Sequence, residues 1–206
     1  MPTFLVVSNP YTLLSAMPRT ATHFMLLDLK DAFFTIPLHP VSQTLFAFTW
    51  QDPETQVSQQ LTWTVLPQGF RDSPHFFGQA LQKDLQTLDL AASHLLQYVD
   101  DLLLCSPTQK LYLQHTAKLL GALGSWGYRV SQSKAQIAQT NVTYLELSIS
   151  HQQITIPPAR IQALINCPLP KTKRGLLSIL GLLNFFHIWI PNFSLIAKPL
   201  YEATKG

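Results

Sequence analysis

Two adjacent carboxylates, Asp100 and Asp101, lie inside an otherwise apolar segment of this 206-residue chain. The segment from Leu95 to Cys105 is apolar on both sides of them, which predicts two buried strands joined by a tight acidic turn. Neighbouring buried carboxylates repel each other and lose hydration, so they need a counter-charge, and no Lys or Arg lies nearby in sequence. A divalent cation supplies one, and Mg²⁺ prefers oxygen ligands from one or two carboxylates completed by water and phosphates.

Asp28 is the expected second donor to this cation. It ends another apolar strand, predicted over His23 to Leu29, far from the acidic turn along the chain. The alternative is that Asp100 and Asp101 form an ordinary solvent-facing turn, because turns favour Asp for backbone reasons alone. In that case Asp28 is an unrelated acid at the end of a strand.

Strand and helix patterns interleave along the rest of the chain, and its last third is mainly helical. Further strands are expected at Leu45 to Trp50 and Leu61 to Val65, with a hairpin over Val142 to Ile156 that turns at His151-Gln152. Helices are expected to begin at Ser73-Pro74, at Ser106-Pro107 and at Thr172, and the last two to end near Gly127 and Trp189.

Charge is divided unevenly between the two halves of the chain. Residues 1–102 carry four Lys and Arg against nine Asp and Glu, a net charge of −5, whereas residues 103–206 carry ten against two, a net charge of +8. An acidic half joined to a basic half suggests a cation site next to a track for a polyanion.

The remaining composition excludes several classes of protein. Cys105 and Cys167 are the only cysteines, too few for a disulfide scaffold, so a reducing intracellular and cytoplasmic setting is expected, with both thiols buried. The most apolar stretch, Leu176 to Ile190, contains Asn184 and His187 and is shorter than the roughly 20 residues of a membrane-spanning helix. We therefore expect a core helix there and no membrane partner.

Three ordered segments resemble the polymerase motifs of gammaretrovirus-like reverse transcriptases, which endogenous retroviruses also encode. They are Leu26 to Phe34 (LLDLKDAFF), Leu61 to Phe70 (LTWTVLPQGF) and Tyr98 to Asp101 (YVDD). Several motifs in the right order are a far stronger signal than any one of them. The resemblance covers essentially the whole chain, since it continues through Gly127-Tyr128, Lys134-Ala135-Gln136, Tyr144-Leu145 and Gly181 to Phe193.

This resemblance implies an α/β (α+β) fold: a reverse-transcriptase palm with a partial fingers segment in residues 1–150, and a helical thumb with the start of the connection in residues 151–206. It also implies that Asp28 and Asp100 each ligate two Mg²⁺ ions, for which Mn²⁺ could substitute. Asp101 would lie beside them, and the backbone carbonyl of Leu29 would complete the site. One ion would activate the primer 3′-hydroxyl, and the other would neutralise the triphosphate and leaving pyrophosphate.

The resemblance further implies contacts to the incoming deoxynucleoside triphosphate. Phe33 would be the aromatic gate that leaves no room for a ribose 2′-hydroxyl, and the alternative is a core pair with Phe34. Lys134 would protonate pyrophosphate, with an exposed, solvated lysine as the alternative. The other implied contacts are the backbone N–H groups of Asp31 and Ala32 at the phosphates, and Gln68 with Gly69 near the nucleotide and template.

The implied partners are an RNA or DNA template with its primer, deoxynucleoside triphosphates and the rest of a Pol polyprotein. Lys171, Lys173 and Arg174 open a helix resembling the thumb, where positive charge can follow a phosphate backbone. The alternative is a solvated charge run at the start of a helix. The other residues implied to contact primer or template are Tyr98, Val99, Tyr144 and Leu145.

Several features depart from the family pattern. Members carry a preceding fingers segment whose basic residues grip the triphosphate, whereas only Arg19 precedes Asp28 among the Lys and Arg of this chain. Glu146 and His187 stand where the family has glycine and, usually, arginine. We therefore expect an RNA-directed DNA polymerase fragment that is inactive alone, with RNase H activity only in the full polyprotein. The alternative is a catalytically silent endogenous retroviral remnant that binds nucleic acid non-specifically.

Overall fold

A computed structural model describes residues 10–151 and 153–205 of the chain. Contact density divides the chain into two compact units, Met1–Ile154 and Thr155–Gly206. The division falls four residues after the boundary expected at residue 150. That the two units are a palm with fingers and a thumb stays a prediction.

A five-stranded antiparallel sheet forms the centre of the first unit. The long strand β1 pairs with β5 along one edge and with β6 and β7 along the other, and β4 completes the sheet beyond β5. The bounds are β1 His23–Lys30, β4 His94–Tyr98, β5 Asp101–Ser106, β6 Arg129–Val130 and β7 Gln136–Gln139. The two apolar strands predicted around the acids are therefore confirmed.

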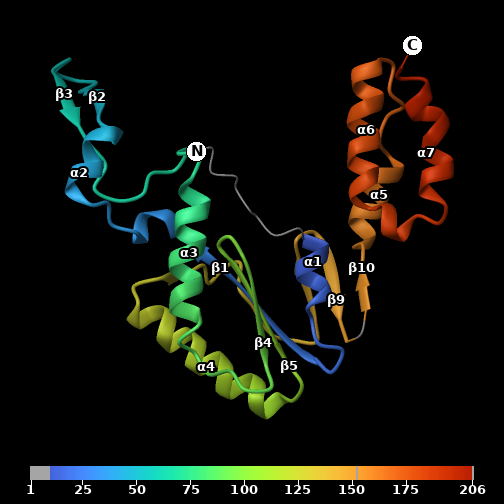
Figure 1. The fold of residues 1–206 in the computed structure, drawn as a ribbon, viewed down its shortest axis with the longest axis horizontal. Coiled ribbons are helices and arrows are strands. Elements are labelled where there is room, and N and C mark those ends of the chain that lie inside the picture. Colours follow the sequence, from blue (N-terminus) through green and yellow to red (C-terminus); the bar gives the residue numbers. More distant parts are fainter. Residues whose placement is uncertain (1–9, 152, 206) are drawn as a thin grey trace. The chain divides into compact units, whose positions relative to one another are not determined.

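Two helices cover one face of this sheet, α3 (Ser73–Leu85) and α4 (Gln109–Ser125) (Figure 1). Because side chains alternate along a strand, one set from β1 and β5 points into this core and the other set points away from it. The buried core residues are Met25, Leu27 and Leu29 of β1, Leu102 and Leu104 of β5, Phe77 and Leu81 of α3, and Tyr112, Leu119 and Leu123 of α4.

The predicted start of α3 is confirmed, whereas the predicted start of α4 is wrong. Ser73 opens α3 with proline in the first turn, as expected. The start predicted for α4 at Ser106-Pro107 is wrong, because Ser106 is the last residue of β5. The helix begins at Gln109 instead, and the hydroxyl of its N-cap Thr108 accepts a hydrogen bond from the Leu111 N–H.

A small arm extends from the sheet between β1 and α3 (Figure 1). Its hairpin is β2 (Phe48–Gln51) and β3 (Ser58–Leu61), preceded by the short helices α2 (Pro40–Gln43) and η2 (Thr44–Phe46). The strand predicted at Leu61 to Val65 is therefore displaced toward the amino terminus. Most of the predicted strand instead forms the segment that returns from the arm to the sheet. It is paired with the outgoing segment by hydrogen bonds from the Leu38 N–H to the Thr64 carbonyl and from the Leu66 N–H to the Ile36 carbonyl.

A second, three-stranded sheet follows the central one, with β8 (Asn141–Tyr144), β9 (Leu147–Ser150) and β10 (Gln153–Thr155) in the order β10-β9-β8. The predicted hairpin over Val142 to Ile156 contains an additional turn at Leu145-Glu146, between β8 and β9, that the sequence analysis missed. Of the turn predicted at His151-Gln152, Gln152 lies outside the described residues.

The second unit is helical, with α5 (Pro158–Ile165), α6 (Lys173–Phe185), η3 (His187–Trp189) and α7 (Phe193–Glu202). Thr172 caps α6 as predicted, since its hydroxyl accepts from the Gly175 N–H at 3.1 Å. The helix predicted in this region is present, but it ends at Phe185 instead of near Trp189. Its predicted core character is wrong, because most of its side chains are exposed or half-buried and Leu180 is its buried residue. None of the described helices is long and apolar enough to cross a membrane.

Phe77 offers a test of the central core, because it is fully buried and its ring lies edge-on to Phe33 and Tyr128. We expect Phe77→Ala to lower the free energy of unfolding by about 3–5 kcal/mol. Phe76, the neighbouring and half-exposed phenylalanine of α3, is the matched control, and Phe76→Ala is expected to cost about 1 kcal/mol or less. Equal losses in urea unfolding of the two variants would contradict the packing described.

Candidate active site

The three predicted acids come together through the pairing of β1 with β5. Asp28 is the direct cross-strand partner of Asp101, so both side chains point to the same face of the sheet, away from α3 and α4. The backbone carbonyl of Asp100 accepts a hydrogen bond from the Leu29 N–H at 3.0 Å. Strand pairing alone therefore places like charges from two distant parts of the chain beside one another.

The acidic turn is a two-residue connection between β4 and β5. Tyr98 pairs with Asp101, and the residues between them are Val99 and Asp100. Val99 has a φ of 54°, a left-handed conformation that is unusual for a β-branched residue. Backbone strain of this kind persists only where the surroundings hold it in place, and it is frequent at functional sites.

A second turn, between β6 and β7, holds Asp28 at both its backbone and its side chain. The Ser131 N–H donates to the Asp28 carbonyl at 2.8 Å, and the Lys134 Nζ donates to Asp28 Oδ2 at 3.1 Å. This turn and the acidic edge of the sheet border an open cavity of about 760 Å³. Its lining includes Asp28, Lys30, Asp31, Asp100, Ser131, Gln132, Ser133 and Lys134.

Electrostatics at this edge are unfavourable in the absence of a cation. Burial raises the pKa of Asp101 to about 6, and repulsion by Asp100 and Asp28 adds to the effect of burial, while Lys134 opposes it. Burial also raises the pKa of Asp100, with Asp28 adding to the rise. Half-buried carboxylates with elevated pKa values at one strand edge are a reason to suspect a functional site.

The donor set fits a hard divalent cation that the protein holds only in part. No group of three or more His, Cys, Asp or Glu side chains within the described ranges could hold a metal ion by itself. Mg²⁺ usually keeps several waters and takes one or two protein carboxylates, with substrate phosphates completing its shell. Asp28 and Asp100 line one cavity and supply such a pair, whereas Asp101 lies on the same face of the sheet without lining that cavity.

The residues expected at the nucleotide follow directly after β1. Asp31 has a left-handed φ of 54° and precedes the short helix η1 (Ala32–Thr35), in which Ala32 is buried. Phe33 packs edge-on against Phe77 at 5.7 Å, whereas Phe34 stacks on Trp63 at 5.5 Å. Phe33 therefore packs against the core, as the alternative expected, but its partner is Phe77, while Phe34 packs on Trp63.

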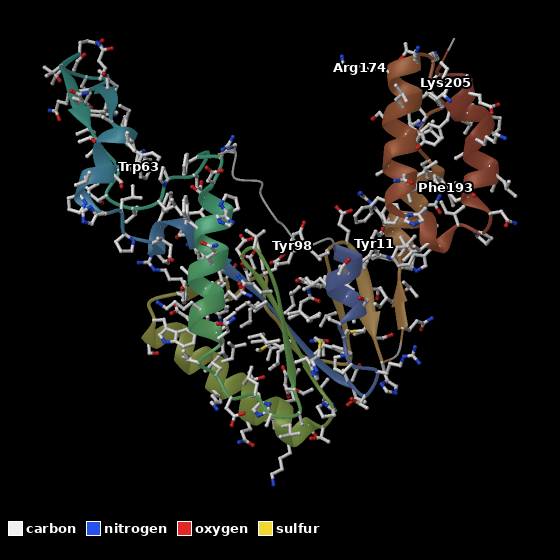
Figure 2. The ribbon with its side chains drawn as sticks, in the orientation of Figure 1. Tyr11, Trp63, Tyr98, Arg174, Phe193 and Lys205 are labelled. Carbon is white, nitrogen blue, oxygen red and sulfur yellow. The ribbon has the colours of Figure 1, made fainter. Side chains whose placement is uncertain are left out.

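Gln68 and Gly69 are not brought into the cavity of the acids. Gln68 instead lines a hollow of about 470 Å³ under the arm, together with Phe46, Trp63 and Phe70. Figure 2 shows Trp63 in this arm, well removed from Tyr98 at the end of β4. Gly69 has a φ of 87°, and a Cβ there would meet nothing within 4 Å, so the backbone conformation is what favours glycine.

The residues expected at the primer differ in exposure. Tyr98 and Val99 line a separate cavity of about 450 Å³ against α3. Tyr144 is buried, and its hydroxyl has no hydrogen-bond partner among the described residues, which makes it part of the packing under the acidic edge and not a surface contact. Leu145 and Glu146 have φ values of 50° and 62°, the conformations of a two-residue turn in which Asn-Gly is favoured.

Lys171, Lys173 and Arg174 are exposed and lie in the second unit, around the start of α6, where Figure 2 labels Arg174. The sequence analysis missed Ser131, Gln132 and Ser133 as lining of the acidic cavity. Their signal was weak, a polar run between two short strands that only the fold brings to Asp28.

A family profile decides the affiliation of the chain. The profile named reverse transcriptase (RNA-dependent DNA polymerase) matches residues 9–149, the part that contains all three acids. The chain belongs to the reverse transcriptase family. The matched segment is therefore a reverse transcriptase domain of the retroviral Pol type, and the mixed helix-and-sheet fold predicted for it is confirmed.

Curated relatives of this reverse transcriptase domain are retroviral polyproteins. The chain is 50% identical over 202 residues to the Gag-Pol polyprotein of avian reticuloendotheliosis virus, a match that covers 97% of the chain and 18% of the relative. It is also 50% identical over 203 residues to the Gag-Pol polyprotein of baboon endogenous virus, covering 97% of the chain and 12% of that relative. The chain thus spans less than a fifth of the length of these relatives.

Solved reverse transcriptases share the fold. A foamy viral protease-reverse transcriptase in complex with RNA/DNA hybrid aligns with a TM-score of 0.82 and 31% identity, covering 98% of this chain and 26% of that chain. The same kind of enzyme in complex with double-stranded DNA aligns with a TM-score of 0.84 and 31% identity, covering 97% and 34%.

The raised pKa of Asp101 has a consequence for stability. An unfolded Asp titrates near about 3.9, so the folded chain binds more protons than the unfolded chain between about pH 4 and 6, and stability falls as pH rises through this window. Asp101→Asn removes that cost. In metal-free protein we expect its melting temperature to exceed that of the wild type at about pH 7.5, with the gap closing toward about pH 4.5.

Glu54→Gln is the matched control for this comparison, because Glu54 is an exposed acid of the arm. It is expected to leave the melting temperature unchanged at both pH values. An Asp101→Asn variant that melts below the wild type at neutral pH would contradict the repulsion described.

Glu146 supplies a second test, based on backbone conformation. Its φ of 62° carries a strain of about 1–3 kcal/mol that glycine would not have, partly offset by the entropy that glycine loses on folding. We expect Glu146→Gly to stabilise the chain by roughly 1 kcal/mol, measured by urea unfolding. Glu146→Ala separates the two causes, because it removes the carboxylate but keeps the strain, and it should give no such gain.

Proposed function

We propose that this reverse transcriptase domain, as part of a longer Pol polyprotein, performs RNA-directed nucleotidyl transfer with two Mg²⁺ ions, held by Asp28 and Asp100 with Asp101 beside them. The observation that carries the proposal is the cross-strand pairing of Asp28 with Asp101, which puts three carboxylates from two remote segments at one edge of the sheet. When bound, the two ions would activate the attacking hydroxyl and neutralise the triphosphate and the leaving group.

The chain's own residues support this chemistry in defined ways. Asp28 and Asp100 supply carboxylate oxygens to one cavity, and the hydrogen bond from the Leu29 N–H to the Asp100 carbonyl fixes the turn against β1. The Leu29 carbonyl is proposed as a further ligand. The backbone N–H groups of Asp31 and Ala32 would bind phosphate oxygens at the start of η1, a conformation that presents N–H groups to an anion.

Phe33 is proposed to exclude a ribose 2′-hydroxyl. Its ring packs against the buried ring of Phe77, so it could not move away from a bulky sugar without disturbing the core. Lys134 lies within reach of the same cavity, where an ammonium could donate a proton to a leaving pyrophosphate. Gln68 and Gly69 would act at the template side of the arm.

A template and primer of RNA or DNA are the proposed partners. The foamy viral enzymes that this chain resembles were solved with RNA/DNA hybrid and with double-stranded DNA. Residues 103–206 carry the net charge of +8, and Lys171, Lys173 and Arg174 are exposed, as contacts to phosphates require. Binding is therefore expected to be salt-dependent and indifferent to sequence.

We further propose that the 206-residue chain does not extend a primer by itself. The lysines that line the acidic cavity are Lys30 and Lys134, and Lys134 is engaged with Asp28. Cations to hold a triphosphate are therefore scarce in the lining of this site. The second candidate function, a silent nucleic-acid-binding remnant, is favoured by the strained Glu146 turn.

A chimera separates the two candidates. The chain replaces the matching segment of the baboon endogenous virus polyprotein's reverse transcriptase, to which it is 50% identical. Primer extension on an RNA template is measured with Mg²⁺ and deoxynucleotides, for the chimera, for its Asp100→Asn variant and for the isolated chain. We expect extension by the chimera, at least a hundredfold less by the variant, and none by the isolated chain.

Equal extension by the chimera and its Asp100→Asn variant would refute the catalytic role of the acid. A chimera that binds hybrid in a salt-sensitive manner but extends no primer would favour the silent remnant. Extension by the isolated chain would refute the proposal that it is inactive alone.

A further inference from the structure

Among the residues that the structure describes, Lys134 is the cation that forms an ion pair with the acidic edge of the sheet. Its Nζ lies 3.1 Å from Asp28 Oδ2, and the ion pairs among the described residues are this one and Arg71–Asp72. The two partners are 106 residues apart in sequence, so the contact exists only in the folded chain. Lys30 lines the same cavity without an ion pair in that described part of the structure.

Backbone hydrogen bonds hold Lys134 in a turn beside Asp28. The Lys134 and Ala135 N–H groups both donate to the Ser131 carbonyl, which closes a turn, while the Ser131 N–H donates to the Asp28 carbonyl. Ala135 packs against the central core and anchors the far side of this turn. The turn is therefore attached to β1 at the residue whose carboxylate the lysine binds.

The side chain itself remains free to leave. The Lys134 side chain is 68% exposed, against 23% for Asp28, so the ammonium stays largely hydrated and the ion pair is weak. A lysine with a flexible stem can release a carboxylate at little cost, because water replaces the contact. A divalent cation has twice the charge and accepts the same oxygen as a ligand.

We propose that Lys134 is a placeholder cation: it neutralises Asp28 while the site is metal-free, and the arriving metal ion displaces it into the cavity. This inference rests on the proposed metal-binding function of the acids. It makes Lys134 a positioning residue, because the ammonium holds the Asp28 side chain toward the cavity until the metal takes its place. Lys134 then competes with the metal, and removing it should tighten metal binding.

Mn²⁺ is the probe, because it binds oxygen ligands and its free concentration is measured by electron paramagnetic resonance. Binding is titrated for the wild type, Lys134→Gln, Lys30→Gln, Asp28→Asn and the Asp28→Asn/Lys134→Gln pair. Lys30→Gln removes the same charge from the same cavity, so it corrects for long-range attraction. We expect Lys134→Gln to bind Mn²⁺ roughly twofold to fivefold more tightly than Lys30→Gln, as displacement of an exposed ion pair requires.

The gain in Mn²⁺ affinity from Lys134→Gln should vanish in the Asp28→Asn background, because the amide offers no ion pair to displace.

A second measurement follows the lysine itself. Acetylation by an amine-reactive reagent, measured by mass spectrometry, should increase at Lys134 on addition of Mn²⁺ and stay constant at Lys30. Equal Mn²⁺ affinities for Lys134→Gln and Lys30→Gln, with Asp28→Asn still weaker, would overturn the placeholder role and leave the metal site standing. If Asp28→Asn binds as tightly as the wild type, the metal site and the inference both fail.

Discussion

Repulsion between carboxylates is the constraint around which the first unit is built. The pairing of β1 with β5 sets Asp28 opposite Asp101, and the turn adds Asp100, at a place where burial already raises the pKa of Asp101 to about 6. The free-energy cost of burying these like charges is offset by apolar side chains of the same strands, which pack against α3 and α4 on the other face of the sheet. An unfavourable charge cluster at one end of strands whose apolar side chains are buried on both faces is the pattern expected when a fold gives up stability for function.

Local sequence signals predicted the parts of the fold whose cause is local. Apolar runs around Asp28 and the acidic turn predicted β1, β4 and β5, and Thr172 predicted the start of α6. The turn at Leu145-Glu146 escaped prediction, since neither residue has the turn chemistry that positive φ values favour. The displaced strand β3 has a similar origin, because Thr62 to Val65 has strand-like residues but serves as the segment that returns from the arm to the sheet.

The arrangement of the site could not be predicted from the sequence, because it depends on contacts between residues that are far apart along the chain. The sequence pointed to Asp28, Asp100 and Asp101, but their convergence depends on strand register, which no residue type specifies by itself. The division of the chain into an acidic and a basic half suggested a cation site from the acidic half next to a polyanion track from the basic half. Lys134, from the basic half, instead contacts Asp28 of the acidic half, and the polar turn before it lines the same cavity.

The central claim is that these acids form one cation-binding centre, and carboxylate ¹³C NMR with Mn²⁺ tests it most directly. A paramagnetic ion broadens only nearby resonances, so substoichiometric Mn²⁺ should broaden the signals of Asp28, Asp100 and Asp101 together. The signals of Asp52 in the arm and of exposed Asp89 should stay sharp. Broadening of all acids alike, or of Asp28 without the two acids of the turn, would contradict a shared centre.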